Sequence, residues 1–117
     1  MYTLAYLFQV EEERVDDFLR IQRQASRIYL EHGALDDETL APADETPRYG
    51  LRSFRDALDL PEGSRPFIGL ARFRDEAHHD EVMALVDADP RIDDLFAKMQ
   101  GVIRISEVAF GDFARVI

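Results

Sequence analysis

The first ten residues combine an apolar run with a two-residue alternation. One side of a strand over residues 2–10 is wholly apolar or aromatic, and it consists of Tyr2, Leu4, Tyr6, Phe8 and Val10. The other side carries only Thr3 and Gln9 as polar residues. A strand with one face in water alternates more sharply between apolar and polar positions. The pattern therefore predicts a strand over 2–10 that is covered on both faces.

A helical period replaces the alternation after residue 10. Val15, Phe18, Ala25 and Tyr29 recur at the spacing of one helix face, and charged residues occupy the opposite face. Gly33 follows at the place where helices often end with a left-handed residue. We predict a helix from Glu11 to His32.

The middle of the chain is more polar and contains more turn residues. A second strand is predicted over 34–40, at an exposed edge because Asp36, Asp37 and Glu38 interrupt it. Residues 41–50 form a predicted loop, since they include two prolines and a glycine. Residues 51–60 fit either a short helix capped by Ser53 or a short strand. A third strand over 67–73 is again apolar on both sides.

The last part of the chain predicts two helices and a closing strand. Asp75 is suited to cap a helix that runs to Ala88, and its predicted core residues are Val82, Leu85 and Val86. Pro90 stops that helix and is well placed to begin another, from Asp89 to about Met99. Residues 102–117 are predicted to form one strand or a bent pair of strands, with Gly111 as a bulge or kink.

This order predicts an α+β, ferredoxin-like βαββαβ fold, with an antiparallel sheet and helices on one face. A length of 117 residues suits a single domain over 1–117. The predicted strands are nevertheless apolar on both faces, and helices on one side leave the other side uncovered. A second copy of the same sheet is the simplest cover, so we predict a homodimer formed through the sheet faces.

Composition narrows the possible functions. The chain has no cysteine, which excludes disulfides and thiolate metal sites, and its formal net charge is −10 with a single lysine, Lys98. Nucleic acid is therefore not an expected partner.

No basic leader segment and no apolar run long enough to cross a bilayer is present, so the predicted location is the cytoplasm and no membrane partner is expected. We found no motif for a metal or a cofactor.

Three histidines are candidates for chemistry. His32, at the end of the first predicted helix, fits a general base or a ligand-binding donor, but also a histidine that favours the negative end of a helix dipole. His78 and His79 are adjacent, so they point about 100° apart on a helix and are poorly placed to chelate one ion. His78 leans toward the core, where it is a candidate ligand contact or a packed core-edge residue.

Two arginines and a tyrosine complete the candidate site. Arg72 and Arg104 lie within predicted strands, where either one could anchor a carboxylate ligand or pair with an acidic side chain. The acidic partner would be Glu107 or a residue of a neighbouring chain. Tyr6 could line an apolar pocket or simply belong to the core.

Several short motifs in this chain are similar to a known family. Glu31-His32-Gly33-Ala34-Leu35 after the first helix, Ala88-Asp89-Pro90-Arg91-Ile92 and the closing Gly111-Asp112-Phe113 resemble the YbaA-like family of uncharacterised bacterial proteins. The chain departs from that family's pattern at Leu70, Met83 and Ser106-Glu107, as a divergent member would. The resemblance implies a dimeric α/β barrel, whose superfamily includes cofactor-free monooxygenases, isomerases and proteins without known chemistry.

Three functions are compatible with these features. In the first, the protein binds a small apolar or aromatic molecule between the sheet and the first helix, without catalysis. In the second, it is a cofactor-independent enzyme, monooxygenase-like or isomerase-like, in which His32 acts as base or orienting donor and an arginine stabilises negative charge. In the third, it is a dimer with a structural or regulatory role. The sequence slightly favours the first.

Overall fold

The computed structural model describes all residues, 1–117. The strands are β1 (Tyr2–Glu11), β2 (Asp36–Leu40), β3 (Ser64–Phe73) and β4 (Ala109–Ala114). The helices are η1 (Glu12–Arg14), α1 (Val15–Glu31), α2 (Phe54–Ala57), α3 (Glu76–Asp87), α4 (Pro90–Gln100) and η2 (Ile105–Glu107).

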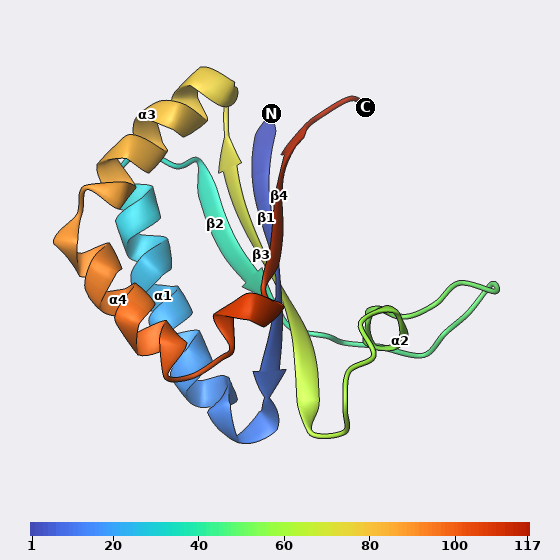
Figure 1. The fold of residues 1–117 in the computed structure, drawn as a ribbon. Coiled ribbons are helices and arrows are strands. Elements are labelled where there is room, and N and C mark those ends of the chain that lie inside the picture. Colours follow the sequence, from blue (N-terminus) through green and yellow to red (C-terminus); the bar gives the residue numbers. More distant parts are fainter.

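The four strands form one antiparallel sheet in the order β2-β3-β1-β4 (Figure 1). The two longest strands, β1 and β3, pair along their whole lengths in the centre, from Tyr2 opposite Phe73 to Glu11 opposite Ser64. The short strands β2 and β4 lie at the edges. The predicted ferredoxin-like α+β fold is therefore confirmed.

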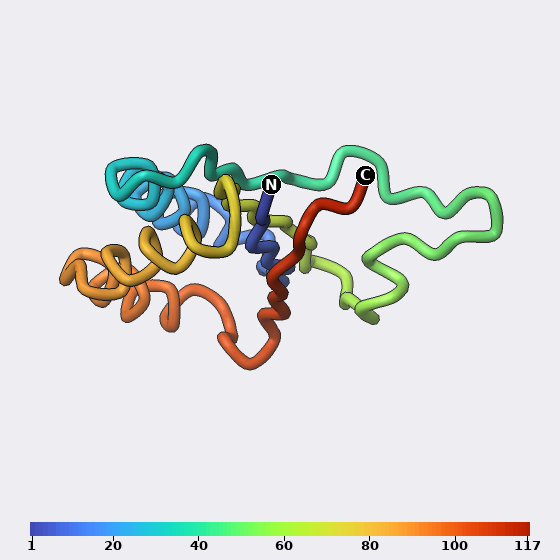
Figure 2. Tube along the Cα trace, turned by 90° about the horizontal axis from the view of Figure 1, so that it is seen from above, coloured from blue at the N-terminus to red at the C-terminus, as the bar shows by residue number.

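Helices α1, α3 and α4 cover one face of this sheet and leave the other face open (Figures 1 and 2). The core lies between these helices and the sheet, and its most completely buried side chains are Phe18, Phe67, Phe73, Val10, Val82 and Val86. The predicted placement of helices on one face is confirmed. We call the uncovered side the open face; it is formed by Thr3, Ala5, Leu7 and Gln9 of β1 with their in-register neighbours on β2, β3 and β4.

Helix boundaries follow the predicted capping residues. The Asp75 side chain accepts a hydrogen bond from the His78 amide at 2.8 Å, and the Asp89 side chain accepts one from the Arg91 amide at 2.9 Å. Ser53 caps α2, which decides between the two interpretations of residues 51–60 in favour of a helix. Gly33 follows α1 with φ of 107°, the left-handed region in which a Cβ is strained.

Residues 41–63 form an arm that extends away from the open-face side of the sheet (Figure 2). Arg55 of α2 holds the base of the arm: its guanidinium donates to both carboxylate oxygens of Glu45 and to the Ser64 carbonyl, at 2.6 Å in the last case. Tyr49 near the tip is 90% exposed.

Two predictions about the last part of the chain are wrong. Residues 102–108 are not a strand; they run through η2, and β4 begins only at Ala109. The apolar residues here instead cover the end of the helical layer, where Ile103 is buried against Leu95 and Met99. Gly111 is not a bulge, because it pairs with Ala5 in a register that continues without interruption on both sides.

The prediction that Leu85 of α3 belongs to the core is also wrong. Leu85 is 52% exposed, whereas Val82 and Val86 of the same helix are buried. Successive helical residues point about 100° apart, so Leu85 falls beyond the narrow stripe that contacts the sheet.

Candidate functional site

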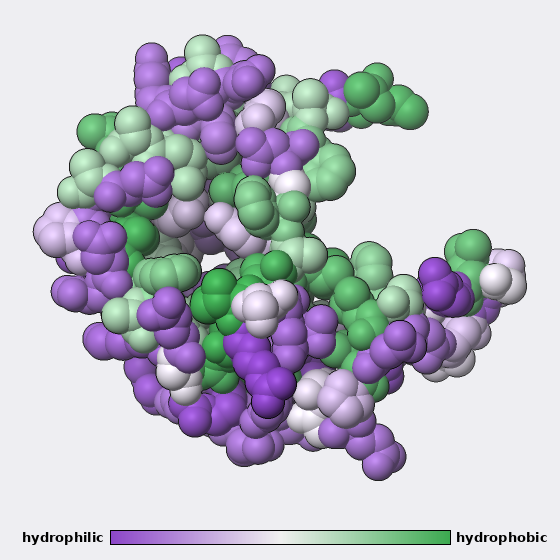
Figure 3. Space-filling view, viewed as in Figure 1, coloured by the Kyte–Doolittle hydropathy of each residue, from purple (hydrophilic) through white to green (hydrophobic).

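A cavity of about 390 Å³ lies between the helical layer and the sheet. The 18 residues that line it come from α1, α4, the η2 segment and all four strands, and 15 of them are hydrophobic. In the space-filling view a hollow is visible at this place, surrounded by hydrophobic residues (Figure 3). The cavity is therefore an apolar site at the position where the sequence predicted one, between the sheet and the first helix.

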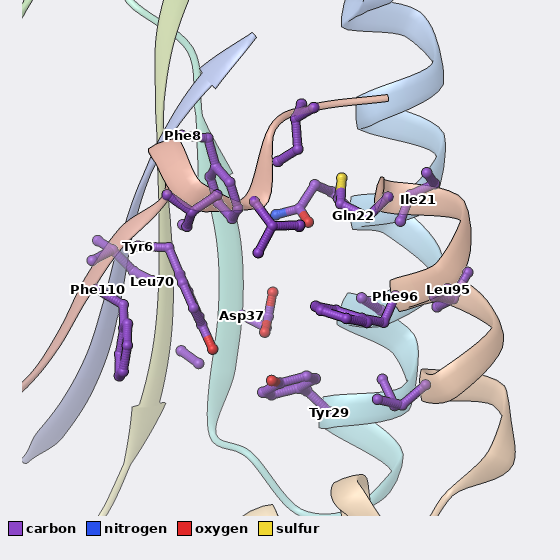
Figure 4. A pocket seen from close by; sticks show the side chains of 18 residues that line it. Tyr6, Phe8, Ile21, Gln22, Tyr29, Asp37, Leu70, Leu95, Phe96 and Phe110 are labelled. Carbon is purple, nitrogen blue, oxygen red and sulfur yellow. The ribbon is translucent and has the colours of Figure 1, made fainter. Parts of the chain in front are cut away.

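Aromatic side chains line one wall and the mouth of the cavity (Figure 4). The rings of Tyr6 and Phe8 are stacked with centroids 5.6 Å apart, and Phe110 of β4 lies 6.0 Å from Tyr6. Phe110 and Phe96 are 72% and 52% exposed although both line the cavity. These two rings therefore stand where the cavity meets solvent.

Small residues leave the space that the cavity occupies. Gly69 and Ala71 of β3 face the helices, and Ala25 of α1 faces the sheet. A Cβ on Gly69 would come within 3.1 Å of the Phe8 ring, closer than side chains normally approach. Larger residues at these positions would fill the cavity.

Four of the lining residues carry polar groups on their side chains into the otherwise apolar cavity: Tyr6, Gln22, Tyr29 and Asp37. The side chains of Tyr6, Tyr29 and Asp37 point toward one another in its centre, from β1, α1 and β2 respectively (Figure 4). Gln22 of α1 donates to the Thr39 hydroxyl at 3.0 Å, and the Ser26 hydroxyl donates to the Asp37 carbonyl at 3.1 Å. These two bonds fix β2 against α1 and so hold Asp37 in place.

The Asp37 carboxyl is unusual among the many acids of this chain. Burial raises its pKa from 3.8 to about 7, and the negative charges of Asp36 and Glu38 act in the same direction. An interaction with the Ser26 hydroxyl opposes the rise. Asp37 therefore exchanges a proton near neutral pH, where an ordinary aspartate is fully ionised.

The two cavity tyrosines stay protonated at neutral pH. Burial raises the pKa of Tyr29 and of Tyr6, and the charge of Asp37 contributes to both rises. Their hydroxyl groups are therefore neutral hydrogen-bond donors that face a titrating carboxyl group.

His32 does not line the cavity. It ends α1, and its Nε2 lies 2.9 Å from the Asp89 carboxylate, at the beginning of α4. Arg91 binds the same carboxylate and also Glu31, both through Nη2. These hydrogen bonds hold the pKa of Asp89 far below its usual range, with those from Arg91 the largest contribution. The cluster joins the end of α1 to the start of α4, which matches the helix-ending interpretation of His32.

The structure places the other predicted site residues in three separate environments. Arg72 is on the open face, where it pairs with Glu38 at 2.7 Å and Asp36 at 3.1 Å, rather than with Glu107. Arg104 is largely exposed and lies 3.6 Å from Glu107. Of the five candidates, Tyr6 alone lines the cavity.

His78 is packed into the core at the first turn of α3. Only 6% of its surface is exposed, and its Nδ1 accepts a hydrogen bond from the Arg74 amide at 3.0 Å. This contact fixes the turn between β3 and α3. The rings of both adjacent histidines lie near Phe73, with centroids 5.9 Å away for His78 and 5.0 Å away for His79, and His79 also contacts Tyr2.

Sequence reasoning missed Asp37, Tyr29 and Gln22 as site residues. Asp37 was assigned to an exposed acidic edge together with Asp36 and Glu38. The signal that would have found it is the alternation within that strand: Asp36 and Glu38 share one face, so Asp37 must share the other with Thr39. The face with Asp37 is the one that the helices cover.

The structure offers no metal centre and no membrane-spanning helix. Nowhere do three or more histidine, aspartate or glutamate side chains gather closely enough to hold a metal ion. None of its helices has the length and apolar character needed to cross a bilayer.

A family model described as "Protein of unknown function (DUF1428)" matches residues 1–103. The chain belongs to this family. The match includes β1 to α4 and every polar residue of the cavity. No curated protein matches the chain.

Solved structures with the same fold include three that match over nearly the whole chain. An antibiotic biosynthesis monooxygenase is 14% identical with a TM-score of 0.63, and the match covers 100% of both chains. An uncharacterised NIPSNAP domain protein from Burkholderia xenovorans is 12% identical, with a TM-score of 0.59 and coverage of 99% of this chain and 95% of that one. Protein Atu4242 from Agrobacterium tumefaciens is 13% identical, with a TM-score of 0.59 and coverage of 99% and 94%. At these identities the likeness shows the fold alone.

Proposed function

We propose that this protein binds a small, largely apolar aromatic molecule in the cavity between the sheet and α1. The observation that carries this proposal is a cavity with aromatic and aliphatic walls and a few polar groups that converge in its centre. Its volume of about 390 Å³ is within the range of small-molecule sites.

The charges around the cavity favour a neutral ligand. No arginine, lysine or histidine lines it, and its one ionisable acid is Asp37. An anionic ligand would meet Asp37 without a cation to balance its charge. The carboxylate anchor that Arg72 or Arg104 could have supplied is not part of this cavity, so the ligand class is an uncharged aromatic compound with a hydroxyl or carbonyl group.

Binding of 2-naphthol tests this proposal. The chain contains no tryptophan, so the fluorescence of a naphthol can be followed without interference from indole. We expect saturable binding to the wild-type protein and its loss in Ala25→Leu, which places a larger side chain in the cavity. Ala84→Leu, on an exposed position of α3, is the matched control and should bind like wild type. Equal binding by both variants, or none by wild type, contradicts the proposal.

A catalytic function is the second candidate. The observation that favours it is a carboxyl group that titrates near neutral pH inside an apolar cavity. The base proposed from the sequence, His32, is bound to Asp89 outside the cavity, so Asp37 replaces it in this function.

We also propose that the open face packs against the same face of a second copy. The supporting observation is its apolar centre, which is formed by Ala5 and Leu7 of β1 and Ile68 and Leu70 of β3. These side chains are only half-buried by their neighbours in one chain, and the helices lie on the opposite side. Two such faces would cover each other in an isologous dimer.

Two further proposals rest on the sequence. We propose that the chain is a divergent YbaA-like member of its family, on the motifs Gly33-Ala34-Leu35 and Asp89-Pro90-Arg91. The structure gives both motifs physical roles, because Gly33 ends α1 with a positive φ and Asp89 begins α4. The cytoplasm is the compartment that we propose, and the absence of cysteine is compatible with a reducing compartment.

A further inference from the structure

We propose that Asp37 is a general base that removes a proton from the carbon next to the carbonyl group of a neutral aromatic ketone, with the Tyr6 and Tyr29 hydroxyls binding the resulting enolate oxygen. The proposed activity is therefore an isomerase or tautomerase activity. It rests on the proposed function, because the ketone occupies the same apolar cavity.

The first support is the convergence of three polar groups in an otherwise apolar space. Asp37, Tyr6 and Tyr29 come from three different elements, β2, β1 and α1, and their side chains point toward one another in the cavity (Figure 4). Enolisation needs a base at the carbon and a donor at the oxygen, a few ångströms apart. A carboxyl group beside two phenols supplies both parts.

The second support is that these groups have the protonation states that the reaction needs. Asp37 has a pKa of about 7, so a substantial fraction is ionised at neutral pH and the base is much stronger than an ordinary aspartate. Burial keeps the tyrosines protonated, so they can donate. An apolar cavity also strengthens their hydrogen bonds to an enolate.

Charged groups lie near Asp37 on its own strand and on α1. On its own strand, Asp36 and Glu38 raise its pKa, although their side chains point to the open face. On α1, Arg23 and Arg27 line a second, more polar pocket outside the cavity, which Ser26 and Asp37 also border.

The remaining neighbours of Asp37 add no charge that would neutralise it. Across from Asp37 on β3 lies Ala71, which is uncharged. The more distant Asp87 raises the pKa values of both tyrosines, and Asp112 raises that of Tyr6. No cation lines the cavity itself.

The reaction is balanced without a cofactor. The Asp37 carboxylate takes the proton, the C–H electron pair becomes the new C=C bond, and the C=O π pair moves to oxygen. The enolate oxygen accepts hydrogen bonds from the tyrosine hydroxyls. Asp37 then returns its proton, either to the same carbon, which regenerates the ketone, or to the far carbon of a conjugated enolate, which yields the double-bond isomer.

Hydrogen–deuterium exchange at the α-carbon of 2-tetralone tests the proposal. 2-Tetralone is a neutral bicyclic aromatic ketone, and its enol closely resembles 2-naphthol. In deuterated buffer, proton NMR follows the loss of the α-hydrogen signal. We expect the wild-type protein to accelerate exchange, with kcat rising with pH until Asp37 is ionised near pH 7.

Three variants test separately the general base, the hydrogen-bond donor to the enolate and a control position. Asp37→Asn should lower the protein-dependent exchange rate by about 100-fold or more, as expected for loss of a general base. Tyr29→Phe should lower kcat by about 10-fold or more, as expected for loss of an oxyanion donor. Asp94→Asn is the matched control, because this exposed aspartate of α4 is not among the residues that line the cavity, and it should exchange like wild type. Circular dichroism confirms the fold of each variant.

The outcomes distinguish this proposal from the binding function. If 2-naphthol and 2-tetralone bind but wild type and Asp37→Asn exchange the α-hydrogens equally, the general base is wrong and the binding function stands. If exchange is lost equally in Asp94→Asn, the effect is not specific to Asp37 and the proposal is also wrong. If neither compound binds, both the binding function and the base are wrong.

Discussion

Asp36 and Asp37 are neighbours in the chain, yet β2 turns their carboxyl groups to opposite faces of the sheet. Asp36 forms an exposed ion pair with Arg72, whereas Asp37 enters an apolar cavity without a cationic partner. An ionised carboxylate in such surroundings costs folding free energy. The same residue that would supply chemistry therefore weakens the native state, which is a common feature of functional sites.

We expect Asp37→Asn to stabilise the protein at pH 8. The folded pKa of Asp37 is raised from 3.8 to about 7, so the native state binds more protons than the unfolded state between these values. Stability from this group is therefore present at low pH and is lost as pH rises through 7. The full shift corresponds to about 4 kcal/mol, and partial solvent screening reduces our expectation to about 1–2 kcal/mol.

Urea unfolding of both proteins from pH 4 to pH 8 measures this effect. The advantage of Asp37→Asn should be largest at pH 8 and should vanish near pH 4. Asp94→Asn, which removes an exposed carboxylate of α4, should show no such gain. A constant difference between Asp37→Asn and wild type at every pH would contradict a raised pKa.

At the scale of elements, the helix ends marked by Asp75, Pro90 and Gly33 could be predicted. The start of α1 at Val15, predicted at Glu11, and the segment between α4 and β4 could not. Helix caps and residues with positive φ are determined by neighbours in the sequence, so a local pattern is enough to place Asp75, Pro90 and Gly33. The apolar residues between 102 and 108 satisfy a strand pattern equally well, but they pack on Leu95 and Met99 from another element. Whether an apolar run forms a strand is decided by such distant contacts.

The Asp75 cap gives a prediction at this scale. Asp75→Ala removes the acceptor for the His78 amide at the start of α3, and we expect the free energy of unfolding to fall by about 1 kcal/mol. Asp75→Asn retains an acceptor oxygen and should remain close to wild type. Urea denaturation measures both, and an equal loss in the two variants would show that the charge, rather than the cap, is what matters.

At the scale of the whole molecule, the sequence predicted where the cavity lies but not which residues give it chemistry. Apolar strand faces and amphipathic helices can be recognised from the periodicity of the sequence. They therefore indicated an apolar region between the sheet and the helix. The meeting of Asp37, Tyr6 and Tyr29 depends on the strand order β2-β3-β1 and on the position of α1 above it. No local pattern in the sequence contains that information, so the sequence alone favours His32 as the base.

The open face gives the last prediction, and one strand supplies both the test and its control. Leu4 and Leu7 of β1 point to opposite sides: Leu4 is 3% exposed beneath the helices, whereas Leu7 pairs with Ile68 on the open face. If two open faces pack together, Leu7→Asp should place a charge in the interface and convert a dimer to a folded monomer in sedimentation velocity. Leu4→Asp should instead unfold the chain, because an unpaired buried charge costs about 3–5 kcal/mol. A wild-type protein that sediments as a monomer at micromolar concentration would overturn the dimer, and the half-buried apolar face would then need another partner.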